Sequence, residues 1–227
     1  LIILIGGLIV LVESVMVGTF IYQGFPLPWS AMFTVMATPL SLLLAILGVM
    51  TVTSEWGQRT SLVTFALEPR RMRVVLAKLL AGLLASIVLL LFTIVFTAGI
   101  NAFQASMVGE PATWDVSRTV LIGFGVSHLS AFLLGFSFGM LIPNTPTAIV
   151  AYFAFRLVIP GLPMGVAAIW SWFEPVVVWI HFSNALSTYF IDPSFGEELA
   201  HLLTAASLWV LLPLVLGSFL LVRREIK

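Results

Sequence analysis

Apolar segments of about twenty residues recur along the whole chain, and they constrain its fold more than any other feature. A membrane-spanning helix needs about 20 apolar residues, because the hydrocarbon core of a bilayer is about 30 Å thick. Six segments of this 227-residue chain meet that requirement. They are Ile2–Tyr22, Ala31–Thr53, Val74–Asn101, Thr119–Ile142, Thr145–Ile169 and Leu199–Val222. We therefore predict an all-α, polytopic membrane protein with six transmembrane helices, forming a single transmembrane domain over residues 1–227.

The composition excludes an ordinary soluble domain. Hydrophobic residues make up 60% of the chain and charged residues 9%, whereas soluble domains carry about 25% charged residues. The formal net charge is zero, so we expect no nucleic-acid partner. The chain has no cysteine and three scattered histidines, so we expect no metal site. It begins inside an apolar run without the basic region of a signal peptide, and we expect the native N-terminus to precede Leu1.

Basic residues lie mostly on one side of the predicted membrane. Eight of the ten Lys and Arg residues fall between positions 54 and 78 or in the tail after position 222. Loops on the cytoplasmic side of a membrane carry an excess of Lys and Arg. We therefore predict that this side is cytoplasmic. An even number of spans then places both termini in the cytoplasm.

The connection between the fifth and sixth spans is long and too apolar for a solvated loop. Backbone at membrane depth must be helical or buried in protein. We predict two short helices at the outer leaflet, about Trp172–Trp179 and Asn184–Phe190. Pro160, Gly161 and Pro163 also predict that the fifth span bends or ends early.

The longest polar stretch between two spans is residues 54–78, which carries five of the ten basic residues. From Glu55 to Leu67 the chain can form an amphipathic helix with Trp56 on its apolar face. Pro69 ends this helix, because the residue before a proline is pushed out of the α region. A basic amphipathic helix can rest on anionic lipid headgroups or lie in the groove of a protein partner. Physical chemistry alone leaves both interpretations open.

The pattern of this stretch resembles that of the ABC-2-type transporter permeases. In that family an acidic residue, a Gly-Thr pair, a hydrophobic stretch, a Pro with a nearby Arg, and a Lys precede the third span. The corresponding residues are Glu55, Thr60, Phe65, Pro69, Arg70 or Arg71, and Lys78. Arg59 stands where the family usually has Gly, which predicts continuous helix there. The resemblance extends over nearly the whole chain through the six spans, the cytoplasmic termini and the short helices before the last span.

The resemblance implies the membrane subunit of a bacterial ABC exporter in the plasma (inner) membrane. Such a permease pairs with a second permease chain, identical or different, and with separate ATPase subunits. The chain has no G-x-x-x-x-G-K-[S/T] phosphate loop, so we expect no catalytic residue and no bound cofactor, with ATP and Mg²⁺ held by the partner. The implied cargo is amphipathic or lipid-like: a drug, lipid, glycan or peptide. The implied contacts with the ATPase subunit, through a coupling helix, are Glu55, Trp56, Arg59, Thr60, Phe65, Leu67, Pro69, Arg70 and Arg71.

Three ionisable residues lie well inside predicted spans: Glu13, His128 and Arg156. Charges at that depth are costly, so each is a functional hypothesis by default. Glu13 and Arg156 would neutralise each other as a pair, within one chain or across a dimer, and the pair would either pack the bundle or line a substrate path. The alternative is that both residues are unpaired and lie near water or lipid headgroups. His128 is either a hydrogen-bonded packing residue or a proton relay.

The same three residues support a competing hypothesis, an ion-coupled secondary transporter. That class predicts inverted repeats with broken helices at matching positions, and the chain shows no such symmetry. An intramembrane enzyme would need a convergent catalytic set, and neither His-Glu-x-x-His nor G-x-S-x-G is present.

Small residues recur every four positions along the fourth span. They let another backbone approach closely, either within the bundle or from a second subunit. The residues are Gly123, Ser127, Ala131, Gly135 and Gly139.

Overall fold

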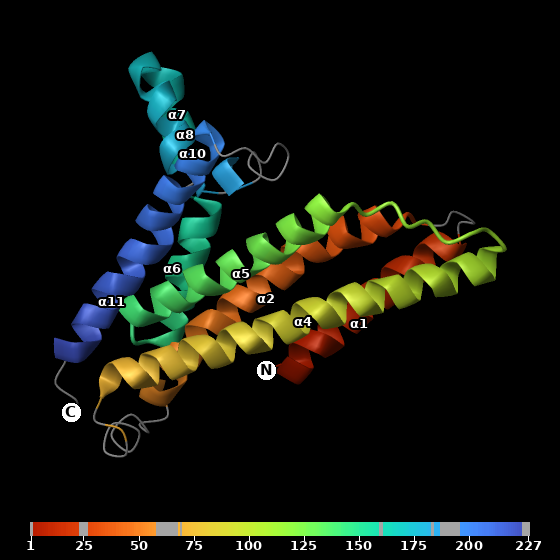
Figure 1. Cartoon of the computed structure of the whole chain (residues 1–227), viewed down its shortest axis with the longest axis horizontal. Coiled ribbons are helices and arrows are strands. Elements are labelled where there is room, and N and C mark those ends of the chain that lie inside the picture. Colours follow the sequence, from red (N-terminus) through yellow and green to blue (C-terminus); the bar gives the residue numbers. More distant parts are fainter. Residues whose placement is uncertain are drawn as a thin grey trace. The chain divides into compact units, whose positions relative to one another are not determined.

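The structure is a computed structural model, and every regular element in the part that it describes is a helix (Figure 1). The described residues are 2–22, 27–57, 68, 70–158, 161–182, 184–186 and 196–223. The helices in chain order are α1 (Ile2–Tyr22), α2 (Trp29–Gly57), α4 (Arg71–Val108), α5 (Arg118–Leu141), α6 (Thr145–Leu157), α7 (Gly161–Ile169), η1 (Ser171–Phe173), α8 (Glu174–Ile180), α10 (Glu197–Ala206), η2 (Ser207–Leu211) and α11 (Leu212–Arg223).

Five helical segments among these residues are long and apolar enough to cross a membrane, which is compatible with a multi-pass membrane protein. The five segments are Trp29–Glu55, Arg71–Val108, Arg118–Leu141, Thr145–Ile169 and Glu197–Leu220. The all-helical class predicted from the sequence is confirmed. α1 adds a shorter described apolar stretch, Leu4–Met16.

The fifth predicted span is divided near the site that its prolines and glycine indicated. α6 ends at Leu157 and α7 begins at Gly161. η1 and α8 together cover the first predicted short helix. Of the second, residues 184–186 are helical and the rest lies outside the described residues.

The chain divides into two compact units, and three helices contribute to both. Unit 1 consists of Leu1–Leu44 and Leu83–Leu129, and unit 2 consists of Ala45–Gly82 and Ser130–Lys227. That residues 1–227 form one transmembrane domain stays a prediction. Each unit is described by itself below.

Unit 1 is organised around a polar stripe on α4. Thr93, Thr97, Asn101 and Gln104 are all at most 1% exposed and follow the 3.6-residue period of one helix face. Gln104 bonds both backbone groups of Leu27: the Leu27 N–H donates to Oε1 at 3.3 Å, and Nε2 donates to the Leu27 carbonyl. Buried amides need such partners, which explains how α4 continues past the predicted end at Asn101 to Val108.

The loop between α4 and α5 caps the start of α2. Pro28, which precedes α2, has no side-chain acceptor for the free N–H groups of the first turn. The Trp29 N–H donates instead to the Thr113 hydroxyl at 3.3 Å, and the Ser30 N–H donates to the Asp115 carboxylate at 3.1 Å. The Ser30 hydroxyl donates to the other oxygen of Asp115. This carboxylate therefore serves as a helix cap supplied from far along the chain.

The hydrogen bond from the Ser30 hydroxyl holds the pKa of Asp115 below its usual value. Burial opposes this effect and comes second in size, and the Ser30 backbone amide adds a smaller lowering. Because the folded pKa is lowered, the stabilisation is complete above the unfolded pKa of about 3.9 and is lost as pH falls through the folded pKa. We predict that Asp115→Asn weakens the folded state by about 0.3–1 kcal/mol at neutral pH, because the amide keeps a capping oxygen and loses only the negative charge that favours a helix N-terminus. Thermal unfolding of the detergent-solubilised protein at several pH values measures this. Glu110→Gln, which neutralises an exposed carboxylate nearby, should change little; a pH-independent Asp115→Asn effect would contradict the prediction.

Unit 2 is built around α5, which contacts α2, α4 and α11 at glycines. A Cβ added to Gly48 of α2 would overlap the Phe132 carbonyl of α5, and one added to Gly135 of α5 would overlap the Ala45 carbonyl of α2. A Cβ added to Gly139 would lie 3.0 Å from the Val49 carbonyl oxygen. The small residues at 135 and 139 therefore serve packing within the chain, one of the two uses predicted for the stripe.

The last helical segment of unit 2 contains a π-helical turn, η2, which ends two residues before Pro213. Proline lacks the N–H that would continue the α-helical bonds, and π turns leave backbone carbonyls for other donors. The Ser137 hydroxyl of α5 lies 3.2 Å from the Val210 carbonyl oxygen and 2.8 Å from the Leu133 carbonyl oxygen of its own helix, and its single hydrogen is shared between the two. The Trp209 indole N–H donates to the Ile180 carbonyl, at the end of α8, at 2.7 Å. α8 in turn packs against α7 and α10 (Figure 1).

Candidate functional site

The candidate site lies where α2 ends, α4 begins and α5 connects to α6, which we call the polar end of unit 2. α2 runs without a break through Gly57, so Glu55 lies in its last turn. Among the predicted contact residues, Arg59, Thr60, Phe65, Leu67 and Pro69 lie outside the described residues, as does the side chain of Trp56. The structure places Glu55, Arg70 and Arg71.

Glu55 forms an ion pair with Lys78 of α4. The Lys78 Nζ lies 2.9 Å from Glu55 Oε2, and the two side chains are 19% and 24% exposed, respectively. Carbonyl dipoles at a helix C-terminus disfavour a carboxylate, so Lys78 supplies the compensating charge for Glu55. The pair links the two helices on either side of residues 58–67.

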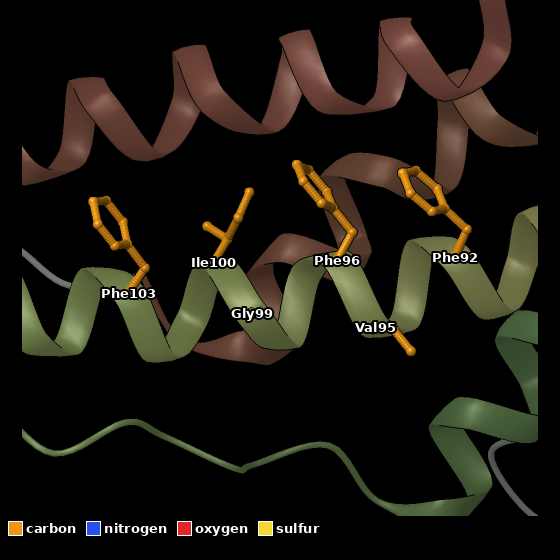
Figure 2. Close-up of a pocket in the computed structure, with 6 residues that line it drawn as sticks. All are labelled: Phe92, Val95, Phe96, Gly99, Ile100 and Phe103. Carbon is orange, nitrogen blue, oxygen red and sulfur yellow. The ribbon is translucent and has the colours of Figure 1, made fainter. Parts of the chain in front are cut away.

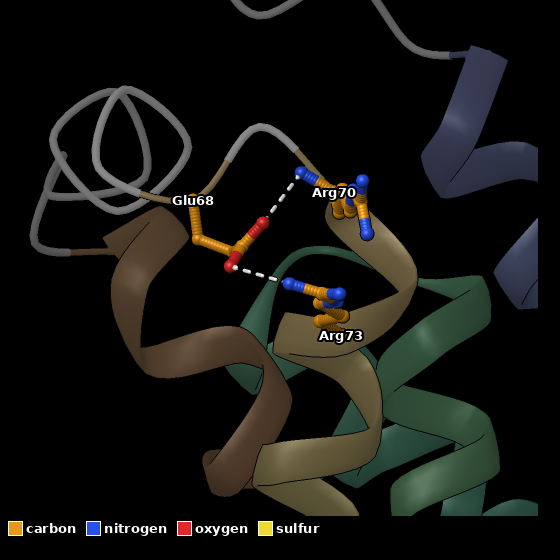
Figure 3. Close-up of polar contacts among 3 residues, drawn as sticks. All are labelled: Glu68, Arg70 and Arg73. Carbon is orange, nitrogen blue, oxygen red and sulfur yellow. Dashed lines mark hydrogen bonds and ion pairs between the residues drawn. The ribbon is translucent and has the colours of Figure 1, made fainter.

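A second, looser polar cluster surrounds the start of α4 (Figure 3). Glu68 accepts a hydrogen bond from the Arg70 N–H at 3.0 Å, and its other oxygen lies 3.7 Å from the Arg73 guanidinium. Arg73 and Glu68 are 61% and 39% exposed. Basic residues at a helix N-terminus oppose the helix dipole, and the Glu68 carboxylate offsets that cost. Arg70 is exposed and Arg71 half-buried.

The α5–α6 connection is fastened to the end of α2 by a hydroxyl pair. The Thr145 hydroxyl donates to the Thr53 hydroxyl at 2.8 Å, and Thr53 is fully buried. Asn144 caps α6 by accepting the Thr147 N–H at 3.0 Å, and Pro146 occupies the first turn, where a missing N–H costs nothing. The polar end therefore joins three helices through side chains.

The intramembrane candidates lie in different parts of the chain. His128 is 2% exposed; its Nε2 lies 3.0 Å from the Ala37 carbonyl oxygen of α2, and its Nδ1 is within hydrogen-bond distance of the Phe124 carbonyl. A neutral imidazole carries one N–H and donates to only one of these carbonyls at a time. Both neighbours are backbone groups, and the Ala37 contact joins α5 to α2, which favours the packing interpretation over a proton relay.

Arg156 lies half-buried on α6 and forms a side-chain hydrogen bond with the phenol of Tyr152, one turn earlier. Glu13 lies in α1, and its side chain is outside the described part of the structure. The Glu13–Arg156 pair therefore stays a prediction.

An apolar hollow of about 310 Å³ lies along α4 in unit 1. Figure 2 shows Phe92, Phe96, Ile100 and Phe103 projecting from one side of the helix, with Val95 on the opposite side. It contains no titratable side chain. The described residues hold no group of three His, Asp or Glu side chains arranged for a metal ion.

The pairing of Glu55 with Lys78, and of Thr53 with Thr145, was missed from the sequence. A usable signal existed for the first pair, because opposite charges stand near the facing ends of two consecutive, antiparallel spans. The threonines carry no such signal, since a hydroxyl is common at the end of any span.

Comparisons of this chain with protein-family models, with curated proteins and with solved structures give no match.

Proposed function

We propose that the chain is the membrane-spanning permease subunit of an ATP-driven exporter of the ABC-2 type. The observation that carries the proposal is the polar end of unit 2, where the Glu55–Lys78 ion pair joins α2 to α4 and the Thr53–Thr145 hydroxyl pair joins α2 to α6. A partner that loads residues 54–73 would thereby act on the whole of unit 2. The sequence pattern of Glu55, Pro69, Arg70 and Lys78 supplies the family resemblance.

The proposal includes a membrane topology with six spans and with the polar end in the cytoplasm of a bacterial cell. The chain has no cysteine, so single cysteines can be introduced without background. We predict that Thr147→Cys is labelled by a membrane-impermeant maleimide only after the membrane is opened. Thr113→Cys, on the loop between α4 and α5, should be labelled in intact spheroplasts. The reverse pattern would contradict the orientation.

The proposed complex contains two permease chains, identical or different, and two ATPase subunits that hold ATP and Mg²⁺. Its cargo is amphipathic or lipid-like, which suits entry from the bilayer between apolar helices. Purification of the tagged chain in mild detergent should recover a soluble protein that carries a phosphate loop, with vanadate-sensitive ATP hydrolysis in the complex. Repeated recovery of the chain without such a partner, together with uptake driven by an ion gradient, would support a secondary transporter instead.

A further inference from the structure

We propose that the Glu55–Lys78 ion pair is the input of a coupling route that crosses unit 2 and ends at α8. The route runs through α5 and the π turn η2, and each of its steps is a contact within unit 2. The inference rests on the proposed function, since the load on the ion pair would come from an ATPase subunit. The inference adds which residues transmit the displacement through unit 2 and which helix the displacement reaches.

The input is a charge on the packed side of α4. Arg71, Val75, Lys78 and Gly82 follow the helical period of one face. Val75 is 5% exposed, and a Cβ on Gly82 would overlap the Phe132 ring of α5. A lysine on this face is tolerated because Glu55 neutralises it at 2.9 Å. The ion pair therefore fixes the end of α2 against the packed side of α4 instead of resting on an open surface.

The ion pair is backed by close contact with α5. The ring of Phe132 meets Gly82 of α4, and the Phe132 backbone meets Gly48 of α2. Phe132 is fully buried. Close-packed interiors transmit displacement because they have little free volume to absorb it. A shift of the joined ends of α2 and α4 therefore acts directly on α5.

α5 passes the displacement to the last helical segment through Ser137. Ser137 lies between Phe132 and Met140 on α5 and is fully buried. Its hydroxyl shares one hydrogen between the Leu133 carbonyl of α5 at 2.8 Å and the Val210 carbonyl of η2 at 3.2 Å. Met140 contacts Gly217 of α11 on the far side of the π turn. π turns inside α-helices are rare and frequently lie at functional sites.

The output is the end of α8. The Trp209 indole, which lies in η2, donates to the Ile180 carbonyl at 2.7 Å and packs on Phe155 with ring centroids 4.6 Å apart. Ile180 is the last residue of the segment formed by α7, η1 and α8. In this segment Trp170 and Trp172 are 54% and 70% exposed. A large exposed aromatic surface suits contact with the membrane interface. Movement of η2 thus reaches a region placed to meet lipid or amphipathic cargo.

The experiment uses the complex of the full chain with its co-purified ATPase subunit in nanodiscs. Trp172→Cys carries an environment-sensitive fluorophore as the only thiol of the chain, which is otherwise cysteine-free. The signal is the fluorescence change between the nucleotide-free and the ATP–vanadate-trapped complex. We expect Glu55→Gln and Lys78→Gln each to reduce the change about tenfold, within the usual range of coupling factors. Lys78 lies outside the proposed contact residues, so Lys78→Gln should do this while the subunit still binds. Trp209→Phe, which keeps the ring and removes the indole donor, should also reduce it.

The charge swap Glu55→Lys with Lys78→Glu should recover most of the change, because it restores an ion pair. The charge-swap variant also tests the role of the ion pair if one of the single variants fails to fold. Glu110→Gln and Trp114→Phe are the matched controls in unit 1 and should respond like the unchanged chain. Full responses in the ion-pair variants and in Trp209→Phe would overturn the route, as would a folded charge-swap variant that does not respond.

Failure of the proposed function gives a different result. If no ATPase subunit binds the unchanged chain, the permease proposal fails, and the route fails with it. If the subunit binds and hydrolyses ATP but the fluorophore at position 172 does not respond in the unchanged chain, the permease proposal stands and the route is wrong.

Discussion

Replacing Gly135 by alanine is expected to destabilise the protein by about 3 kcal/mol, at the upper end of the cost of overpacking. The added methyl would overlap the Ala45 carbonyl oxygen of α2, together with the carbon atoms beside it. These are backbone atoms, which cannot rotate aside as a side chain does. Relief of the clash requires α2 and α5 to separate, and this also disturbs the reciprocal contact of Gly48 with Phe132.

The same helix offers a matched control, Gly125→Ala. A Cβ at Gly125 meets nothing within 4 Å, so this variant should stay within about 1 kcal/mol of the unchanged chain or gain slightly from the better helix propensity of alanine. Thermal unfolding in detergent compares the two, with Gly135→Ala expected to unfold about 10 °C lower. Equal unfolding temperatures for Gly125→Ala and Gly135→Ala would contradict the close approach of α2 and α5.

Replacing Gln104 by leucine is expected to cost about 2–5 kcal/mol, because two backbone groups lose their partners and each unsatisfied buried group costs about 1–3 kcal/mol. Gln104 is 1% exposed and Leu27 is 8% exposed, so water does not readily replace the lost amide. Leucine has a similar volume, so the effect isolates the hydrogen bonds from the packing. The groups left unpaired are the N–H and the carbonyl of Leu27.

Ser106→Ala is the control on the same helix. The Ser106 hydroxyl is exposed and bonds only the Phe103 carbonyl of its own helix among the described contacts. Its loss should change the unfolding free energy by no more than about 0.5 kcal/mol. Hydrogen exchange at Leu27 provides a second readout, and it should accelerate in Gln104→Leu alone. A Gln104→Leu variant as stable as Ser106→Ala, with unchanged exchange, would show that Gln104 does not hold the start of α2.

Hydropathy predicted the helices well because long apolar runs leave the chain few alternatives. It placed α1 at Ile2–Tyr22, as found. It ended the third span near Asn101, whereas α4 continues to Val108. The next residue, Gly109, has a φ of +79°, which suits the left-handed position after a helix. The extra turns contain Gln104, whose partner Leu27 comes from elsewhere in the chain. A hydropathy profile therefore ends the helix too early.

The candidate site was predictable only as a list of residue types. The charges at Glu55 and Lys78 stand out in an apolar sequence, but their pairing depends on how α2 and α4 each pack against α5 at a glycine. The bond from Trp209 to Ile180 likewise depends on the π turn before Pro213. A proline predicts a bend, yet it does not tell which carbonyl becomes available or which side chain will reach it. Such contacts are set by tertiary packing.

Site-specific photo-crosslinking is the most direct test of the central claim, which is that a separate ATPase subunit docks on the segment between α2 and α4. A photoreactive amino acid is placed singly at positions 59 to 66, with Trp114, on the loop between α4 and α5, as the control position. The account predicts crosslinks to a soluble subunit that carries a phosphate loop from several of the eight positions and none from position 114. A complex that hydrolyses ATP in a vanadate-sensitive manner yet gives no crosslink from any position between 59 and 66 would contradict it.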